Sequence, residues 1–194
     1  MNDPEFLDEL YATCDSCEDD DWDVLCHVGA LLAEDRPHLD LSEALDRACV
    51  EGDNVGLVLQ LLNDPRVDPT NDESSCLASA VALGRIKIVG LLLLEGKVDP
   101  NTGDGMCLDI AIENNHREIA KILLANKRVD PTLNENKALF GAIHDGDTEM
   151  VAELLKYDSV RQTVNWSDMI DDAIEAENTV VLQLLRAASG ITGL

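Results

Sequence analysis

The tetrapeptide Val67-Asp68-Pro69-Thr70 returns as Val98-Asp99-Pro100-Asn101 and again as Val129-Asp130-Pro131-Thr132, 31 residues further along the chain at each step. Repetition with a fixed period of about 20 to 50 residues indicates stacked modules. A second marker keeps nearly the same spacing, a Leu or Ile that is followed three residues later by Ala. It occurs at Leu45 and Ala48, Leu77 and Ala80, Leu108 and Ala111, Leu139 and Ala142, and Ile170 and Ala173. Five units therefore share one frame.

Each unit predicts a pair of short helices. The first helix begins at residue types that cap N-termini, namely Ser42, Ser74, Gly105, Asn136 and Ser167. It ends at residue types that tolerate a positive φ, namely Gly52, Gly84, Asn115 and Gly146. The second helix carries an aliphatic stripe with a late leucine pair, at Leu61-Leu62, Leu92-Leu93, Leu123-Leu124, Leu154-Leu155 and Leu184-Leu185. The Val-Asp-Pro turn and the polar residues after it, at 71–74, 102–105 and 133–136, predict a projecting loop.

Helices of this length need neighbours. An isolated helix of two or three turns is marginal in water, where about 12 to 15 residues are required. Adjacent units must therefore bury each other's aliphatic faces, and stability becomes a sum over nearest-neighbour interfaces. Aromatic residues make up only 3% of the 194 residues, which suits close stacking through Ala and Leu. We expect an all-α fold, an α-solenoid of stacked helix-turn-helix repeats with projecting loops.

The frame x-Leu-x-x-Ala-x-x-x-Gly, seen from Cys76 to Gly84, the following aliphatic stripe and the Val-Asp-Pro turn together resemble the ankyrin repeat. The resemblance covers roughly Ser42 to Leu185, and the junction Asp-Pro-Arg-Val-Asp-Pro at 64–69 is similar to that of a short, 31-residue variety. The family's Thr-Pro-Leu-His element is absent. The resemblance implies an L-shaped unit whose first helices and loops line a concave face, and it implies binding of other proteins.

The frame divides the chain into the parts of one continuous solenoid domain. These are an irregular acidic N-terminal capping repeat at 1–41, four repeats at 42–72, 73–103, 104–134 and 135–165, and a C-terminal capping repeat at 166–194. The last unit has Glu177 and Asn178 where the other units end a helix with Gly or Asn. Near the N-terminus, an acidic run at 14–23 predicts a solvated loop between short helices at 5–13 and 22–33.

Charge selects the class of partner. The chain has 14 Lys and Arg residues against 39 Asp and Glu residues, a formal net charge of −25. Phosphate contacts need clustered Lys and Arg, so we expect no direct nucleic-acid binding and favour a protein partner with a basic surface or peptide. Apolar stretches fall short of the roughly 20 residues that span a bilayer, and no secretory signal opens the chain. We expect a monomer without membrane contact, cytoplasmic or delivered into a host cytoplasm.

Motifs for catalysis or metal binding do not emerge from the residues. Cys14, Cys17, Cys26 and His27 supply four potential zinc ligands, but Cys26 and His27 are adjacent on a predicted helix and point about 100° apart. An EF-hand reading of 99–110 fails because other residues stand where the loop needs Gly and Glu. Neither a glycine-rich phosphate loop nor a nucleophile motif with His is present. We expect no cofactor, no metal and no enzymatic activity.

Residues at equal phase of the repeat stack into columns, and these columns predict the partner-binding residues. Acids recur there beside Phe140 and Trp166, which supply the aromatic contact that binding hot spots usually need. The alternative is that Phe140 packs between neighbouring helices and that Trp166 covers the last interface. His144 lies between Glu113 and Glu175 in its column, so we expect a charged imidazole and pH-dependent binding. The candidates are Asp46, Glu51, Glu73, Asp104, Asp109, Glu113, Glu135, Phe140, His144, Asp145, Trp166, Asp171 and Glu175.

The leading hypothesis is a non-catalytic protein-protein interaction module that presents an acidic concave face to a basic or mixed protein partner. The alternative is an acidic inhibitor that mimics nucleic acid and blocks a DNA- or RNA-binding protein. A metal-dependent or thiol enzyme that uses Cys14 and Cys17 is a third hypothesis. Salt separates the first two, because a mimic loses orders of magnitude in affinity as ionic strength rises.

Overall fold

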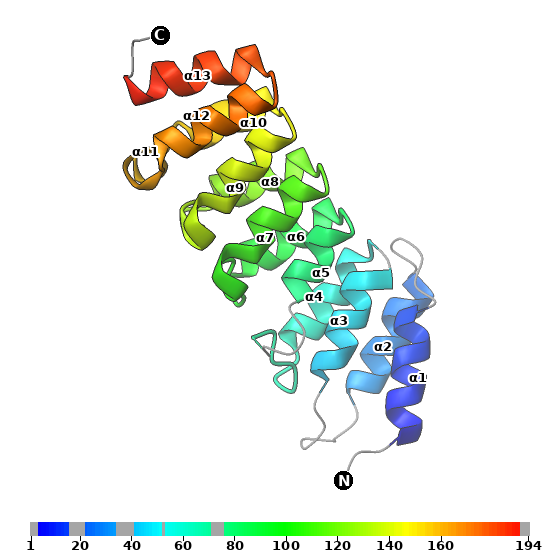
Figure 1. Cartoon of the computed structure of the whole chain (residues 1–194). Coiled ribbons are helices and arrows are strands. Elements are labelled where there is room, and N and C mark those ends of the chain that lie inside the picture. The colour runs from blue at the N-terminus through cyan, green and yellow to red at the C-terminus, as the bar shows by residue number, and fades with distance from the viewer. Residues whose placement is uncertain (1–3, 16–21, 34–40, 52, 71–75, 191–194) are drawn as a thin grey trace. The chain divides into compact units, whose positions relative to one another are not determined.

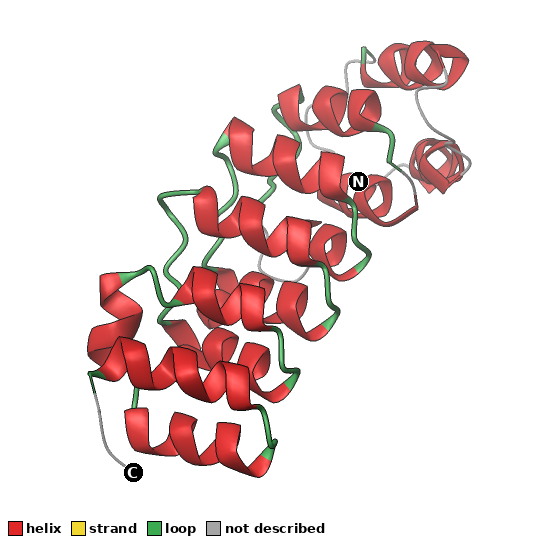
Figure 2. Ribbon diagram, turned by 90° about the horizontal axis from the view of Figure 1, so that it is seen from above, coloured by secondary structure: helices red, strands yellow, loops and turns green. Residues whose placement is uncertain are grey.

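The computed structural model describes residues 4–15, 22–33, 41–51, 53–70 and 76–190. These residues form thirteen α-helices and no strand, so the predicted all-α class is confirmed (Figure 2). The chain divides into two compact units, 1–100 and 101–194. Within each unit the helices pack as hairpin pairs that stack in two layers (Figure 1). The boundaries assigned above to the individual repeats stay a prediction.

The first unit contains three helix pairs. They are α1 (Pro4–Asp15) with α2 (Trp22–Leu32), α3 (Ser42–Glu51) with α4 (Val55–Asn63), and α5 (Cys76–Ala82) with α6 (Ile86–Glu95). The first helices contact one another in the order α1, α3, α5, and the second helices in the order α2, α4, α6. This is the solenoid stacking that the sequence repeat predicts.

The second unit also contains three pairs. They are α7 (Thr102–Glu113) with α8 (Arg117–Ala125), α9 (Leu133–His144) with α10 (Thr148–Leu154), and α12 (Trp166–Glu175) with α13 (Thr179–Ser189). The additional short helix α11 (Asp158–Thr163) lies between α10 and α12 in the chain and contacts α9. Helix α11 occupies the position at which earlier repeats carry the Val-Asp-Pro turn. Here Val160 keeps the frame but Gln162 replaces Pro, so a helical turn is not interrupted.

Aliphatic side chains form the core of both units. The residues that precede each frame Leu or Ile are at most 8% exposed, and they are Ala44, Cys76, Cys107, Ala138 and Met169. In four repeats the first leucine of the leucine pair on the second helix is fully buried. These leucines are Leu61, Leu92, Leu123 and Leu154. The largest fully buried side chains among the described residues are all Leu or Ile. The aliphatic interior expected from the low aromatic content is confirmed there.

A left-handed residue ends the first helix of each described repeat pair. Gly84, Asn115 and Gly146 have φ of 74°, 58° and 69°, as predicted, while Gly52 lies outside the described residues. The residue after each turn donates its N–H to the carbonyl of the frame Ala, for example His116 to Ala111 at 2.8 Å. Glu177 adopts the same turn at φ 52° although it has a Cβ. The turn is therefore imposed by helix pairing even where the residue type disfavours it.

The projecting loop predicted before α7 and α9 is wrong, whereas the predicted starts at Gly105 and Asn136 coincide with the last left-handed residue before the regular helix. α7 begins at Thr102 and α9 at Leu133, where the sequence predicts a projecting loop with helix starts at Gly105 and Asn136. Asn134, Glu135 and Asn136 form a left-handed turn with φ of 50°, 58° and 61°. Gly103 and Gly105 have positive φ at the matching positions of the preceding repeat. Gly and Asn tolerate this conformation, so a compact turn replaces the loop.

The other two starts differ in outcome. α3 begins at Ser42 as predicted, and Ser74 lies outside the described residues. α12 begins at Trp166, one residue before the predicted start, because Asn165 is its N-cap and accepts from the Ser167 N–H at 3.2 Å. An Asn side chain satisfies an unpaired donor of the first turn as well as Ser does.

The Val-Asp-Pro turns are closed by their own side chains. The Asp68 carboxylate accepts from the N–H and the hydroxyl of Thr70 at 2.9 and 2.6 Å. The Asp130 carboxylate repeats the pattern with Thr132 at 2.9 and 2.7 Å. An Asp that bonds the residue two positions later forms an Asx-type turn, which explains why Asp precedes Pro in this motif.

Polar side chains link one repeat to the carboxyl end of the second helix before it. Arg66 donates from Nη2 to the Leu32 carbonyl at 2.7 Å, and Lys97 donates to the Leu62 carbonyl. In the second unit the Tyr157 hydroxyl donates to the Leu124 carbonyl at 2.6 Å. Carbonyls at a helix C-terminus lack intrahelical partners, so these bonds stabilise both the helix end and the stacking of repeats.

Arg66 is itself held by a carboxylate two residues earlier. Its Nε and Nη2 donate to the two oxygens of Asp64 at 2.8 and 2.7 Å, and both side chains are 9% exposed. The hydrogen bond from Arg66 lowers the pKa of the Asp64 carboxyl below its usual range. A bidentate pair fixes the plane of the guanidinium, which then reaches Leu32.

The first prediction concerns the leucine core. Leu92→Ala should lower the free energy of unfolding by about 2–5 kcal/mol, because Leu92 is fully buried and its truncation leaves a cavity. Leu94 lies on the same helix and is 81% exposed, so Leu94→Ala is the matched control and should change stability by under about 0.5 kcal/mol. Urea unfolding followed by circular dichroism measures both. Equal effects of the two variants would contradict the assigned packing.

The second prediction uses the strained turn at Glu177. Glu177→Gly should stabilise the protein by about 0.5–1 kcal/mol, since Gly adopts a positive φ without the Cβ penalty. Glu177→Gln removes the same charge but keeps the Cβ, so it should give little of this gain. Thermal unfolding of the two variants beside the parent chain tests the difference. A Gln variant that is as stable as the Gly variant would assign the gain to charge instead.

The third prediction concerns Asp64 and pH. At pH 7 Asp64→Asn should destabilise the chain by about 2 kcal/mol, because Arg66 loses a charged acceptor. The folded-state pKa of Asp64 lies below its unfolded value of about 3.9, so this contribution is present above that pH. The difference between parent and variant should therefore shrink as the pH falls below about 4. A difference that is constant from pH 7 to pH 3 would exclude the ion pair as its source.

Asp158→Asn is the control for this measurement. Asp158 pairs with Arg161, but its side chain is 77% exposed. Removal of an exposed pair should cost less than about 1 kcal/mol at pH 7.

Candidate partner-binding surface

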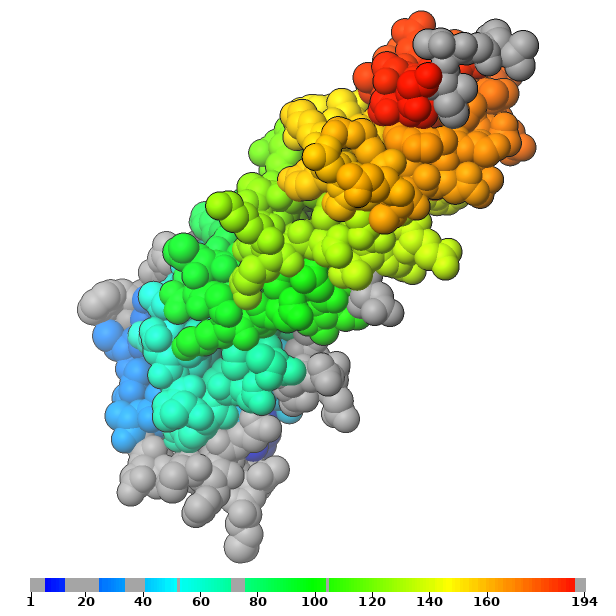
Figure 3. Space-filling model, turned by 90° about the vertical axis from the view of Figure 1, so that its left-hand side faces the viewer, coloured from blue at the N-terminus to red at the C-terminus, as the bar shows by residue number. Residues whose placement is uncertain are grey.

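A cavity of about 870 Å³ lies in the second unit between α9 and α12. Figure 3 shows the adjoining surfaces of these helices, yellow-green for α9 and orange for α12. The residues around the cavity come from the left-handed turn and first helical turn of α9, from the end of α11 and from α12. They are Thr132, Asn134, Glu135, Asn136, Lys137, Phe140, Thr163, Asn165, Asp168, Met169 and Asp172.

Two hydrogen bonds hold the left-handed turn at the edge of this cavity. Asn134 Nδ2 donates to Asp109 Oδ2 on α7 at 3.0 Å. The Thr163 hydroxyl, at the end of α11, donates to Asn136 Oδ1 at 3.2 Å. The turn is therefore tied to the helices on both sides, which fixes where Glu135 stands.

Asp109 is 5% exposed, so it supports the turn and does not present an open carboxylate. Its burial raises the pKa of the carboxyl above the ordinary value, and the hydrogen bond from Asn134 opposes this rise. By its phase in the repeat Asp109 is predicted in the column just inside the first helix, as a partner-binding residue. The structure puts it beneath the turn because α9 covers it.

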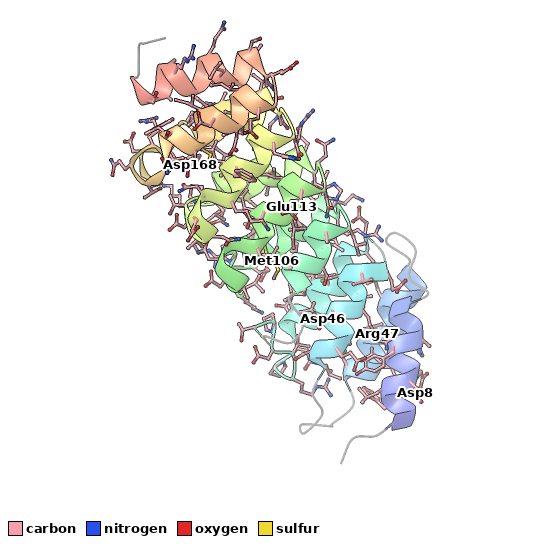
Figure 4. The ribbon with its side chains drawn as sticks, in the orientation of Figure 1. Asp8, Asp46, Arg47, Met106, Glu113 and Asp168 are labelled. Atoms are coloured by element: carbon pink, nitrogen blue, oxygen red, sulfur yellow. The ribbon has the colours of Figure 1, made fainter. Side chains whose placement is uncertain are left out.

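The charge of the cavity is negative. Glu135, Asp168 and Asp172 contribute carboxylates, and Lys137 is the cation among the lining residues. Lys137 Nζ lies 2.9 Å from Glu113 Oε1, and this hydrogen bond raises the pKa of the Lys137 ammonium. Since Lys137 is engaged by Glu113, it does not neutralise the three carboxylates. Figure 4 labels Glu113 and Asp168, which belong to α7 and α12.

Phe140 supplies the aromatic surface of the cavity. Its side chain is 41% exposed, so it is not enclosed between neighbouring helices. The ring stacks against the His144 imidazole one turn later, with centroids 6.4 Å apart and planes inclined by 29°. Met169 on α12 lies at the same cavity and is 8% exposed. Phe and Met are enriched in protein–protein interfaces, so both side chains are suited to contact with a partner.

His144 has a different carboxylate neighbour from the expected ones. Its Nδ1 lies 3.3 Å from Asp145 Oδ1, next to it in the chain. Glu113, expected to flank it, pairs with Lys137 instead. Glu175 is exposed. The two carboxylates expected to flank His144 are therefore not the ones that lie next to it. pH-dependent binding through His144 stays a prediction.

The other candidates are distributed over the two units. Asp145 and Asp171 are exposed, and Trp166 is half-buried at the start of α12, outside the cavity lining. Asp104 lies in α7, but its side chain is outside the described residues, as is all of Glu73. In the first unit Glu51 is exposed and Asp46 is half-buried. The cavity thus joins two of the predicted residues, Glu135 and Phe140.

A polar cluster in the first unit was not predicted. The Tyr11 hydroxyl donates to Glu43 at 3.0 Å, and the Arg47 guanidinium lies 4.5 Å from the centroid of the Tyr11 ring. Arg47 also pairs with Glu43 at 3.2 Å, one helical turn away. Figure 4 shows Arg47 beside Asp46 on α3. The cluster joins α1 to α3, so it contributes to stacking.

Several residues of the cavity also escaped the sequence analysis. Asp168 and Asp172 are four residues apart, a spacing that places both on one face of a helix. Asn134 and Asn136 match Gly103 and Gly105 in the preceding repeat, which is a signal for a left-handed turn. The sequence carries both signals, but only the packing of α12 against α9 brings them to one cavity.

Metal ligands do not gather within the described ranges. No group of three or more His, Cys, Asp or Glu side chains there has an arrangement that could hold an ion. His27 Nε2 lies 3.1 Å from Glu9 Oε1, and Cys26 is exposed as a free thiol. Cys17 and the side chain of Cys14 lie outside the described residues, so the zinc hypothesis is not tested there. In the same part of the chain, every helix is too short or too polar to cross a bilayer.

Comparison with known protein families gives a match. The family model for ankyrin repeats matches residues 45–135 as three copies. None of the curated proteins matches the chain. Ankyrin repeats are protein-protein interaction modules and are generally non-catalytic. The match runs from Leu45 to the left-handed turn at Glu135, so this segment, a little under half of the chain, consists of ankyrin repeats.

Proposed function

We propose that this protein is a non-catalytic interaction module that presents an acidic face to a basic segment of another protein. The observation that carries the proposal is the cavity between α9 and α12, where three carboxylates lie beside the exposed ring of Phe140. A cavity of this volume is within the usual range for ligand sites, about 300–1,000 Å³. Its charge selects a cationic partner and its aromatic ring supplies a contact that excludes water.

The whole-chain charge supports the same class of partner. At −25 the protein attracts basic surfaces over several ångströms and repels nucleic acid and further copies of itself. Exposed acids in the second unit, Asp145, Asp171 and Glu175, extend the negative surface beyond the cavity. We therefore place partner binding on the second unit, with long-range attraction from the full charge and local contact at Phe140.

A nucleic-acid mimic is the second candidate function. The net charge of −25 on 194 residues favours it, since such a chain could occupy the phosphate-binding groove of a DNA- or RNA-binding protein. Binding of that kind depends on many distributed charges and not on one ring. The two functions therefore differ in how they respond to salt and to truncation of Phe140.

The fourth prediction tests the interaction module. Random 12-residue peptides displayed on phage and selected on the intact chain should be enriched in Lys and Arg. Phe140→Ala should weaken binding of the recovered peptides about tenfold or more, because truncating a hot-spot aromatic costs about 2 kcal/mol. Val180→Ala, which truncates a 52% exposed residue on α13, is the control and should leave affinity unchanged. Titration by fluorescence anisotropy gives the dissociation constants.

The salt dependence of peptide affinity distinguishes the interaction module from the nucleic-acid mimic. Affinity for the recovered peptides should fall by less than about tenfold between roughly 0.05 and 0.2 M salt, since few ions are released. A fall of about 10³ or more, with no effect of Phe140→Ala, would favour the nucleic-acid mimic. Absence of any basic enrichment would overturn the acidic-face proposal.

A further inference from the structure

We propose that the cavity between α9 and α12 binds a single arginine side chain of the partner, with its guanidinium between the Asp168 and Asp172 carboxylates and the Phe140 ring. This inference rests on the proposed function and deepens it, because it names one side chain and one site. It is carried by three features of the cavity: an unpaired half-buried carboxylate, a second carboxylate one helical turn away, and an open aromatic face.

The unpaired carboxylate belongs to Asp172. It is half-buried at the cavity and has no ion pair or hydrogen bond within the described part of the chain. Removing a carboxylate from water without a partner is unfavourable, and an incoming cation relieves that cost. Asp168 lies four residues earlier on α12, so the two carboxylates share one face. Asn165 Nδ2 donates to Asp168 Oδ2 at 2.8 Å, which orients that carboxylate.

The nearby cations of the chain itself are engaged elsewhere. Lys137, on the cavity wall, lies 2.9 Å from Glu113. Arg161 on α11 pairs with Asp158 and donates from Nη1 to the Leu155 carbonyl at 2.5 Å. A cation that neutralises Asp172 must therefore come from outside. A second copy of this chain is a poor source, because two molecules of charge −25 repel each other.

Phe140 favours arginine over lysine at this place. A guanidinium is planar and weakly hydrated, so it stacks on an aromatic face while its N–H groups reach carboxylates. A lysine ammonium is a compact, strongly hydrated charge that stacks less well. The 41% exposure of Phe140 leaves ring surface for this contact even though His144 covers part of it. One partly exposed cation–π contact should make the affinity for arginine about two- to fivefold higher than the affinity for lysine.

The volume of the cavity allows more than a side chain. About 870 Å³ exceeds a guanidinium with its aliphatic stem, so flanking residues of an extended segment also fit. Met169 then contacts the aliphatic stem of the arginine. Glu135, which forms no ion pair with the described residues, faces the flanking residues from the left-handed turn. The occupant is thus a peptide segment with arginine at its centre.

The fifth prediction uses three matched nonapeptides of Gly, Ser and Ala with a central Arg, Lys or citrulline. Titration of each into the full-length ¹⁵N-labelled chain, followed by NMR, should shift the amides of Phe140, Asp168 and Asp172. The Arg peptide should bind about two- to fivefold tighter than the Lys peptide. Citrulline keeps the shape of Arg without its charge, so the citrulline peptide should bind about tenfold or more weakly than the Arg peptide.

Variants separate the site from the general charge of the chain. Asp172→Asn should weaken the Arg peptide about fivefold or more, while Phe140→Leu should abolish the preference for Arg over Lys and keep the attraction to both. Glu118→Gln is the matched control. Glu118 is exposed on α8, so this substitution removes one negative charge at a place away from the cavity. Its affinity for the Arg peptide should match the parent chain.

The outcomes distinguish this inference from the proposed function. If Arg and Lys peptides bind equally and Asp171→Asn weakens them as much as Asp172→Asn, the acidic face binds by distributed charge and the arginine site is wrong. If amide shifts fall outside the cavity, the site is also wrong, although a basic partner is retained. If neither cationic peptide binds more tightly than the citrulline peptide, both proposals fail.

Discussion

Burial of aliphatic surface between neighbouring helix pairs is the interaction on which the rest of the structure depends. The helices run from 6 to 12 residues, too short for stable helix formation in isolation. Leu61, Leu92, Leu123 and Leu154 are fully buried at the same place in their repeats, so within each compact unit one helix pair completes the core of the next. Stability in such an array is a sum over neighbours, and the polar bonds from Arg66, Lys97 and Tyr157 to helix-end carbonyls act on the same interfaces.

The stacking also decides where the chain accepts unfavourable backbone conformations. Glu177 takes a left-handed φ because the following helix must return along α12, and Asn134 to Asn136 do so where α9 meets α7. Those turns leave the carboxylates of Glu135, Asp168 and Asp172 around one cavity without enough local cations to neutralise them. This concentration of uncompensated carboxylates is the basis on which we propose a cationic partner.

Function in this protein follows from surface chemistry held on a regular frame. The core positions hold small or aliphatic residues, whereas the exposed positions of α9 and α12 carry most of their charged residues. Asp109 belongs to neither class, because it occupies a repeat position that carries more exposed acids in other repeats but is itself buried beneath Asn134. The Phe140 ring is exposed, which is why we propose it as a contact for a partner.

The sequence by itself determined the helix pairs, the frame of 31 residues, the aliphatic core and the left-handed ends at Gly84, Asn115 and Gly146, because periodic apolar residues and Gly or Asn report local and nearest-neighbour physics. Glu135 and Phe140 are among the binding residues that the sequence predicts, and both line the cavity between α9 and α12. Only the tertiary structure decided that Asp109 is covered, that Lys137 is taken by Glu113, and that Asp168 and Asp172 join Phe140 at one cavity. The physical reason is that repeat phase fixes which residues occupy equivalent positions, whereas burial and pairing depend on how the next helix is seated over them.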